Sequence, residues 1–234
     1  MSRLDGIPWP EASRRAAARE VLLVPLGSTE QHGPHLPVTT DTDIAQAVAD
    51  RAAARGGRLL VAPPVAYGSS GEHEGFAGTL SIGRNATELL LVELGRSATI
   101  HFGRVVVVST HGGNAVPVSR AIHRLAAEGH PVAAWSPRWG GDLHAGRTET
   151  SLMLAIAPER VAIERAEPGD RRPMATLWPL LARSGVASVS RNGVLGDPTG
   201  ASAEEGLRLL DQAADELVGL VGRLEEGANT EVAG

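Results

Sequence analysis

The sequence predicts an α/β protein, a three-layer α/β/α sandwich with a mostly parallel central sheet. The first observation behind this prediction is that short apolar runs, typical of buried strands, alternate with longer segments of helical periodicity. Such alternation is typical of βα units, whose crossover helices cover both faces of a parallel sheet. The second observation is that 234 residues with 42% hydrophobic content suit one compact domain with a sizeable core.

The expected elements follow one another along the chain without a long linker. Strands are predicted at residues 21–26, 59–62, 105–108 and 132–135. Helices are predicted at about 42–55, 85–101, 115–128, 148–157, 174–184 and 202–225. The last helix is amphipathic, because six apolar residues recur on one face: Leu207, Leu210, Ala214, Leu217, Val218 and Val221. We therefore expect a single domain over 1–226 and a frayed tail over 227–234.

The charge and hydropathy patterns exclude several classes of partner. The formal net charge is -5 and no basic run stands out, so the electrostatic footprint of a nucleic-acid-binding protein is missing. No apolar run approaches the roughly 18 residues that span a bilayer, and the first residues lack an apolar signal core. We therefore expect a cytoplasmic protein that acts on a small molecule or a peptide, without a nucleic-acid or membrane partner.

Two absent residue types exclude whole classes of mechanism. The chain has no cysteine, which excludes a thiol nucleophile, a cysteine-held iron–sulfur cluster and any disulfide. All 22 basic residues are arginine, which excludes a Schiff-base lysine and a P-loop lysine. Metal, serine and acid–base chemistry remain.

The most informative stretch is the loop over 27–37, with the sequence Gly-Ser-Thr-Glu-Gln-His-Gly-Pro-His-Leu-Pro, followed by Asp41. It follows a predicted buried strand, and this is where a parallel α/β sheet places its chemistry. Glu30 and His32 are two residues apart, so their side chains leave an extended chain on the same side. From this spacing alone, the two residues are expected to bind one metal centre together.

Two further clusters of histidines and carboxylates lie at strand-to-loop junctions. His111 stands in Thr-His-Gly-Gly-Asn, and His144 precedes Glu149 in the segment His-Ala-Gly-Arg-Thr-Glu-Thr-Ser. Two histidines and three carboxylates suit zinc, iron(II) or manganese, whereas calcium prefers oxygen ligands alone. Five ligands exceed the need of one catalytic ion. A natural partition places Asp41 as a bridge between two ions roughly 3.5 to 4 Å apart.

Each of these residues also has a purely structural interpretation. Asp41 precedes a helical pattern and would serve as its N-cap, and Glu149 would stabilise a first helical turn through the macrodipole. His111 could bond to the main chain at the end of a strand. Asn114 is interpreted as the cap of the next helix. Gly112 and Gly113 favour the metal interpretation, because paired glycines let a ligand or main chain approach closely.

Four spaced motifs together resemble one known family. They are the 27–37 loop with Asp41, the segment Gly-Glu-His-Glu-Gly-Phe at 71–76, His-Gly-Gly-Asn at 111–114, and His-Ala-Gly followed by Glu-Thr-Ser at 144–151. Over about residues 21–203 the chain is similar to the creatininase family of dinuclear metal amidohydrolases. The resemblance implies two divalent metal ions, one held by Glu30, Asp41 and His111, the other by His32, Asp41 and Glu149.

The chain departs from the family pattern at a few positions. Some members draw the fifth ligand from the segment after the equivalent of His111, which here offers only glycines, so Glu149 is assigned instead. Ser109 and Thr110 stand where Asn-Gly is usual, and Ala77 stands where proline is usual. Neither change removes a ligand, although both affect the shape of a loop.

The resemblance also implies a mechanism and roles for further residues. With two metal ions activating water, His144 is the candidate proton donor to the leaving nitrogen, because imidazole titrates near neutral pH. Its alternative is a surface histidine. Glu72 and His73 are candidates for contact with the substrate or for structural packing. Arg147, or else Arg138, is a candidate for holding a substrate carboxylate, with simple solvation as the alternative. His35 is left outside the metal set.

Two segments narrow the resemblance to one branch of the family. Residues 144–154 and 192–202 are similar to the mycofactocin-system branch, which implies a peptidase that releases a cross-linked Val-Tyr dipeptide from a modified ribosomal precursor peptide. A second expectation is an amidohydrolase acting on a small cyclic amide or a formamide. A third is a binding protein that has lost catalysis. The family also implies a homo-oligomer, hexameric or larger.

Overall fold

The fold is taken from a computed structural model that describes residues 3–231, apart from the side chains of Met174 and of residues 227–231. Its sheet has the order β2-β1-β3-β4, with every neighbouring pair parallel. The strands are β1 (Val21–Leu26), β2 (Leu59–Val61), β3 (Arg104–Ser109) and β4 (Val132–Trp135). The central strand β1 is buried along its whole length, as continuous apolar runs predict for a sheet covered on both faces.

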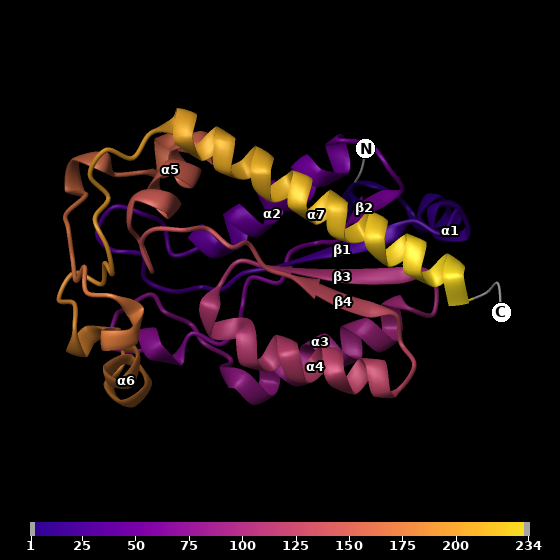
Figure 1. The fold of residues 1–234 in the computed structure, drawn as a ribbon, viewed down its shortest axis with the longest axis horizontal. Coiled ribbons are helices and arrows are strands. Elements are labelled where there is room, and N and C mark those ends of the chain that lie inside the picture. The colour runs from indigo at the N-terminus through magenta and orange to yellow at the C-terminus, as the bar shows by residue number, and fades with distance from the viewer. Residues whose placement is uncertain (1–2, 232–234) are drawn as a thin grey trace.

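Helices cover both faces of the sheet (Figure 1). One layer contains α2 (Thr40–Ala54), α5 (Arg147–Ile156) and α7 (Ala203–Glu231). The opposite layer contains α3 (Gly83–Ala98) and α4 (Ala115–Ala127). Successive strand residues face opposite layers, so Leu23 packs in the core under α2 and α7, while Leu22 and Val24 pack in the core under α3 and α4. The predicted three-layer sandwich with a parallel sheet is confirmed.

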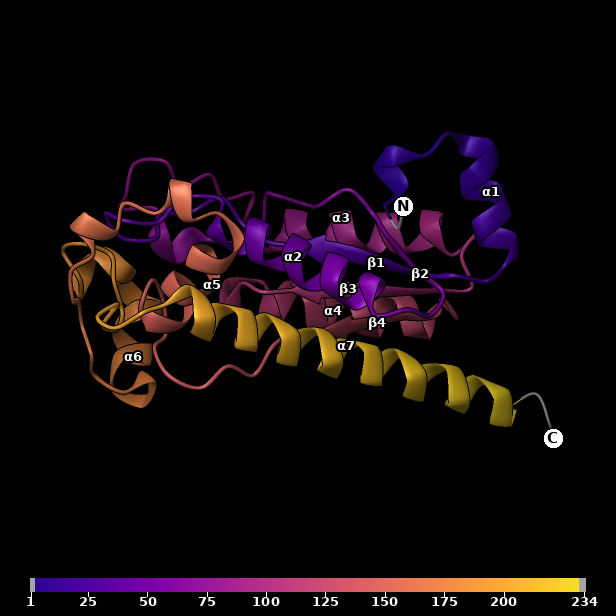
Figure 2. The same ribbon diagram turned by 90° about the horizontal axis from the view of Figure 1, so that it is seen from above.

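The element boundaries agree closely with the sequence prediction, with two differences. Helix α1 (Trp9–Ala17) was not predicted, because its nine residues are mostly polar or alanine and only Ala16 is buried, so the segment carries little apolar signal. Helix α7 runs along most of the length of the molecule (Figure 2) and continues to Glu231. The predicted tail over 227–234 thus falls partly within α7, and residues 232–234 lie outside the described part of the chain.

A smaller subdomain lies beyond the carboxyl ends of the strands (Figure 1). Helix α6 (Met174–Ser184) forms there, with a separate apolar cluster that includes Leu177, Leu181 and Leu195. Short 3-10 turns complete the fold at Leu4–Gly6, Gly71–His73, Gly112–Asn114, Pro158–Arg160, Ile163–Arg165 and Val186–Ser188. Among the described residues, no helix combines the length and the apolar composition needed to cross a bilayer.

Candidate metal centre

The predicted ligand-bearing loops meet at the carboxyl edge of the sheet. They line a cavity of about 1140 Å³, whose polar residues include Glu30, Asp41, His111, His144 and Glu149. Because parallel strands all end at the same edge, loops far apart in the sequence become neighbours there. His32 lies behind this lining and is fully buried.

Glu30 lies at the middle of the cluster and is completely buried. Its Oε2 is 3.2 Å from His111 Nε2, and its Oε1 is 3.3 Å from His73 Nε2 and 3.6 Å from His144 Nδ1. Neither carboxylate oxygen has a hydrogen-bond partner among the described residues. Burial, together with nearby Asp41, raises the pKa of Glu30 well above its usual range. Such a carboxylate is poorly satisfied by protein groups alone, and a cation would complete its coordination.

Asp41 stands in the first turn of α2, but its side chain faces the cavity instead of capping the helix. Its Oδ1 is 3.5 Å from His32 Nε2 and its Oδ2 is 3.3 Å from His111 Nδ1. Ser28 donates its hydroxyl to Oδ2 at 2.9 Å. Although burial opposes ionisation, the two histidines hold the pKa of Asp41 at about 2. One carboxylate therefore presents its two oxygens to two different histidines, as a bridging ligand does.

His32 is oriented by the main chain beside it. Its Nδ1–H donates to the carbonyl oxygen of Glu30 at 3.1 Å, so the lone pair of the neutral ring is on Nε2. This Nε2 is 3.8 Å from Glu149 Oε2 and has no hydrogen-bond partner among the described residues. Burial disfavours the charged imidazole, but Asp41 and Glu149 raise its pKa to about 9. The same buried nitrogen is correctly placed to bind a metal ion once its proton is lost.

His111 bonds to the main chain with one ring nitrogen and faces a candidate metal ligand with the other, so it fits both the structural and the metal interpretation. Its Nε2–H donates to the carbonyl oxygen of Ser69 at 3.0 Å, so Nδ1 carries the lone pair that faces Asp41. Asn114 occupies the N-cap position of α4, but its side chain does not cap the helix. Instead it accepts from the Ser69 amide and donates to the Gly27 carbonyl oxygen, both at 2.9 Å. The loops after β1 and β2 are thereby tied together.

Glu149 lies in the first turn of α5 and reaches back toward His32. Its Oε2 accepts a hydrogen bond from the Ala145 amide at 2.6 Å. Burial raises the pKa of this carboxyl group. Ala145 has a φ of 53°, a left-handed conformation that is rare for a residue with a side chain. This turn directs the side chain of Glu149 into the cavity.

Gln31 is a residue of the site that the sequence analysis missed, although it lies between two predicted ligands. Its side-chain amide donates to His73 Nδ1 at 2.8 Å and to the Gly193 carbonyl oxygen at 3.0 Å. The main-chain carbonyl oxygen of Gln31 lies 2.8 Å from His144 Nε2 and can only accept, so that nitrogen carries the proton and Nδ1 faces Glu30. One residue therefore fixes the tautomers of two imidazoles.

The two imidazoles held by Gln31 are neutral at physiological pH. Burial and the nearby His111 and His32 lower the pKa of His73 to about 3. Burial, with the neighbouring His32 and His73, also lowers the pKa of His144 well below its usual range. His144 is thus a buried residue of the site and not a surface histidine, and His73 is closer to Glu30 than the sequence indicates.

The remaining predicted residues divide into two groups. Glu72 lines the cavity, with Oε1 3.5 Å from His111 Nε2. The structure does not bring Arg147 to the cavity, because its Nε donates to Glu205 of α7 at 2.8 Å and its side chain is half exposed. Arg138 is exposed and also lies outside the cavity lining. His35, left outside the metal set, is buried and bonds to Thr150.

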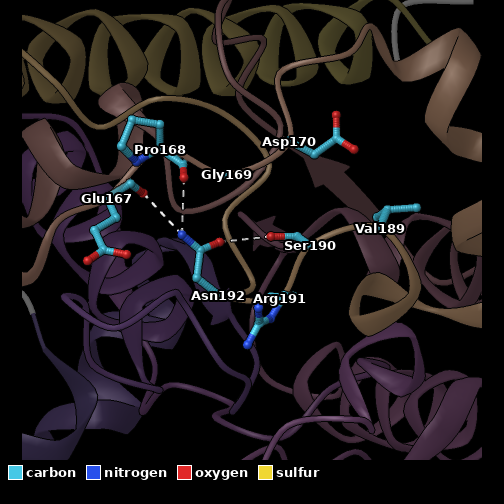
Figure 3. Close-up of a pocket in the computed structure, with 8 residues that line it drawn as sticks. All are labelled: Glu167, Pro168, Gly169, Asp170, Val189, Ser190, Arg191 and Asn192. Carbon is cyan, nitrogen blue, oxygen red and sulfur yellow. Dashed lines mark hydrogen bonds between the residues drawn. The ribbon is translucent and has the colours of Figure 1, made fainter.

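A second hollow of about 560 Å³ lies beside the loop over 189–192 (Figure 3). Asn192 donates to the carbonyl oxygens of Glu167 and Pro168, and its own oxygen accepts from Ser190 (Figure 3). None of the candidate metal ligands lines this hollow. The loop fixed by Asn192 presents the Gly193 carbonyl oxygen to Gln31.

The residues at the cavity fit divalent metal. Among the described residues, three sets of side chains have ligand atoms within 4.8 Å of one another: Glu30, Asp41 and His111; His32, His144 and Glu149; and Glu30, His73 and His144. The unsatisfied oxygens of Glu30 and the unsatisfied Nε2 of His32 provide the independent support for this fit. Mixed imidazole and carboxylate donors suit zinc, iron(II) or manganese. The fold and site thus define an α/β/α protein with a divalent metal centre at the carboxyl edge of its sheet.

Comparison with known proteins identifies the family. The creatininase family, described as creatinine amidohydrolase, matches residues 5–221, and the chain belongs to this family. The chain is 51% identical over 216 residues to the mycofactocin precursor peptide peptidase of Mycobacterium ulcerans (strain Agy99), an alignment that covers 88% of this chain and 86% of that protein. The predicted resemblance is confirmed.

Solved structures agree in fold and in the use of metal. A structure named Creatininase Mn has a TM-score of 0.81 and 27% identity, covering 94% of this chain and 97% of its own. A mutant creatininase described as Zn-Zn type has a TM-score of 0.79 and 26% identity, covering 94% of this chain and 96% of its own. Both named metals are among those that the donor set of this chain suits.

Proposed function

We propose that this protein is a dinuclear metal-dependent peptidase that hydrolyses an amide bond near the C-terminus of a modified ribosomal precursor peptide. The product is a cross-linked Val-Tyr-derived dipeptide. The observation that carries the proposal is Asp41, whose two oxygens face two histidines on opposite sides of one buried cluster. The 51% identity to a mycofactocin precursor peptide peptidase supports the choice of substrate.

Two sets of residues would hold the ions. Glu30, Asp41 and His111 form one set. His32, Asp41 and Glu149 form the other, in which His32 Nε2 is 3.5 Å from Asp41 and 3.8 Å from Glu149, so Asp41 is shared. Zinc, iron(II) and manganese all fit these donors. When bound, such ions lower the pKa of a water molecule toward neutrality and polarise an amide carbonyl.

The side chains around the centre supply the proton transfers. His144 is neutral, and its Nδ1 lone pair faces the cavity because Nε2–H is anchored on the carbonyl oxygen of Gln31. This nitrogen accepts a proton from the attacking water and then delivers it to the leaving amide nitrogen. Glu72 and His73, which line the same cavity, contact the substrate.

The size of the cavity favours a peptide over a small cyclic amide. Its volume of about 1140 Å³ exceeds the roughly 300–1000 Å³ typical of pockets for drug-sized ligands. An amidohydrolase of creatinine or formamide would use the same metals but needs only a fraction of this space. Creatinine and formamide therefore belong in the test as competing substrates.

The decisive experiment incubates metal-loaded protein with the modified precursor peptide, creatinine or formamide, followed by mass spectrometry of the products. We expect the precursor to lose its C-terminal dipeptide. An intact precursor beside rapid turnover of creatinine or formamide would assign the protein to the second activity. A metal content below one ion per chain would instead favour a binding protein without catalysis.

The His144→Ala variant separates proton transfer from metal binding. Because the variant keeps all five proposed ligands, its metal content should match that of the wild type, while turnover falls by roughly 10² to 10⁴. Metal analysis by mass spectrometry and steady-state kinetics provide the two readouts. Loss of metal from this variant would make His144 a ligand instead of a proton carrier.

A further inference from the structure

Two arginines line the same cavity as the metal centre. Arg84 lies in the first turn of α3 and Arg183 in the last turn of α6, so two separate walls each contribute one guanidinium. Neither forms an ion pair or a side-chain hydrogen bond with any residue that the structure describes. Glu74, an acidic residue that also lines the cavity, is not within ion-pair distance of either arginine.

Arginines elsewhere on the surface commonly have carboxylate partners. Arg55 pairs with Asp211 and Asp215, and Arg147 pairs with Glu205. Helix stability does not explain Arg84, because the first turn of a helix disfavours a cation and that turn of α3 contains no acidic residue. Both arginines are exposed at the cavity, so their charges are free to meet a ligand that enters it.

Large apolar side chains line the same cavity as the two arginines. Trp178, Val116 and Ile82 line the cavity and are 59%, 42% and 38% exposed, although exposed side chains of this kind are usually scattered singly. Trp178 lies on the same helix as Arg183, and Ile82 precedes α3 beside Arg84. A tryptophan flanked by arginine is typical of the anchor points of peptide interfaces.

We propose that these residues form a second subsite, in which Arg84 and Arg183 bind a carboxylate of the peptide while Trp178, Val116 and Ile82 hold its apolar side chains. The proposal rests on the peptidase function proposed above and adds the chemistry of the substrate: a peptide carrying an anionic group away from the bond that is cleaved. The planar guanidinium suits this purpose, because it binds a carboxylate through two parallel hydrogen bonds. The carboxylate belongs either to an acidic side chain or to the C-terminus.

The test measures binding and does not require cleavage. Fluorescence anisotropy with metal-loaded protein compares three labelled peptides of equal length: one of glutamate and leucine, one of glutamine and leucine, both with blocked ends, and the glutamine peptide with a free C-terminal carboxylate. We expect the glutamate peptide to bind about tenfold more tightly than its blocked glutamine counterpart. Stronger binding of the glutamine peptide with a free carboxylate alone would assign the subsite to the C-terminus.

Variants assign the preference to the two arginines. Arg84→Ala and Arg183→Ala should each weaken the preference, and the double variant should bind all three peptides within about twofold of one another. Arg223→Ala is the matched control, because Arg223 is an exposed arginine of α7 outside the cavity lining, and this variant should keep the full preference. Equal binding of all peptides by the wild type, or a preference that persists in the double variant, would overturn the subsite. Failure to cleave the precursor would leave the binding result intact, so the two proposals fail separately.

Discussion

At the scale of single residues, Asp41 shows how tertiary structure decides between two roles. Its position at the start of a helix equally fits a cap and a ligand. The side chain enters the cavity because the loop over 27–39 places the start of α2 next to the end of β3. His111 follows β3 there and lies 3.3 Å from the Asp41 carboxylate. Thr110 donates to the Asp41 carbonyl oxygen at 2.7 Å and fixes this approach.

The first prediction concerns this bridging carboxylate. Asp41→Ala should abolish hydrolysis and lower the bound metal to one ion per chain or fewer, because both ligand sets lose a member. His111→Ala should lose metal in the same way. Asp43→Ala is the matched control: Asp43 is also in the first turn of α2, but it pairs with Arg160 on the surface. Full activity of a metal-depleted Asp41→Ala protein would contradict the dinuclear proposal.

The second prediction concerns the side chain of Gln31, which sets the tautomer of His73 and holds the loop at Gly193. Gln31→Met keeps the size of the side chain but removes the donor to His73 Nδ1 and the bond to Gly193. We expect kcat to fall roughly 10- to 100-fold, as for other groups that orient active-site imidazoles. Gln46→Met, at a partly buried glutamine of α2 outside the cavity lining, should have no such effect on kcat. Equal kcat values for the Gln31 variant and the wild type would contradict a role of this side chain in positioning the imidazole of His73.

At the scale of elements, glycines decide how closely the loops approach one another. Gly113 follows β3, and a Cβ atom built there would collide with the Ser69 main chain, His111 Nε2 and the Glu72 carboxylate. Gly112, its neighbour, has open space on the same side of the turn. The pair of glycines that the sequence singles out is therefore required at only one of its two positions.

The third prediction uses this contrast. Gly113→Ala should displace His111 or Glu72 and weaken metal binding by about tenfold or more, because the Ser69 main chain cannot move aside cheaply. Gly112→Ala should bind metal like the wild type. Isothermal titration of metal-free protein measures both affinities. Similar affinities for the two variants would show that the loop adapts to the added methyl group.

At the scale of the whole molecule, metal binding is coupled to protonation and stability. In the metal-free protein the pKa of His32 is raised from 6.5 to about 9, so its proton stabilises the fold below pH 6.5 and this contribution is lost as the pH rises through 9. A metal ion must displace that proton. Burial also raises the pKa values of Glu30 and Glu149, so protons on these carboxyl groups compete with a metal ion at low pH, as the proton on His32 does.

The fourth prediction follows from this linkage. The increase in melting temperature on adding zinc or manganese should grow between pH 6.5 and 9, and a chelator should abolish it. At a free metal concentration of about 100 Kd, the gain corresponds to about 2.7 kcal/mol. Scanning calorimetry across this pH range provides the measurement. A gain that is constant or shrinks with rising pH would show that His32 is not deprotonated by the metal.

Assembly remains a prediction at this scale. The family resemblance implies a hexamer or a larger homo-oligomer, with a mass at least six times the 24.3 kDa of one chain. Light scattering coupled to size-exclusion chromatography distinguishes this from a monomer. Trp9, which is 80% exposed on α1, is a large apolar side chain that an interface would cover.

The sequence by itself determined the fold class, the strands and most helices, and the ligand-bearing loops. Apolar periodicity reports burial directly, and parallel strands bring their following loops to one edge. Helix α1 was not predicted because its nine residues are mostly exposed and are mostly polar or alanine, so they give little apolar signal. Only the tertiary structure decided that Asp41 faces two histidines, that Gln31 orients His73 and His144, and that Arg147 turns away toward Glu205. These outcomes depend on side-chain directions and on contacts between distant segments, which spacing along the chain does not specify.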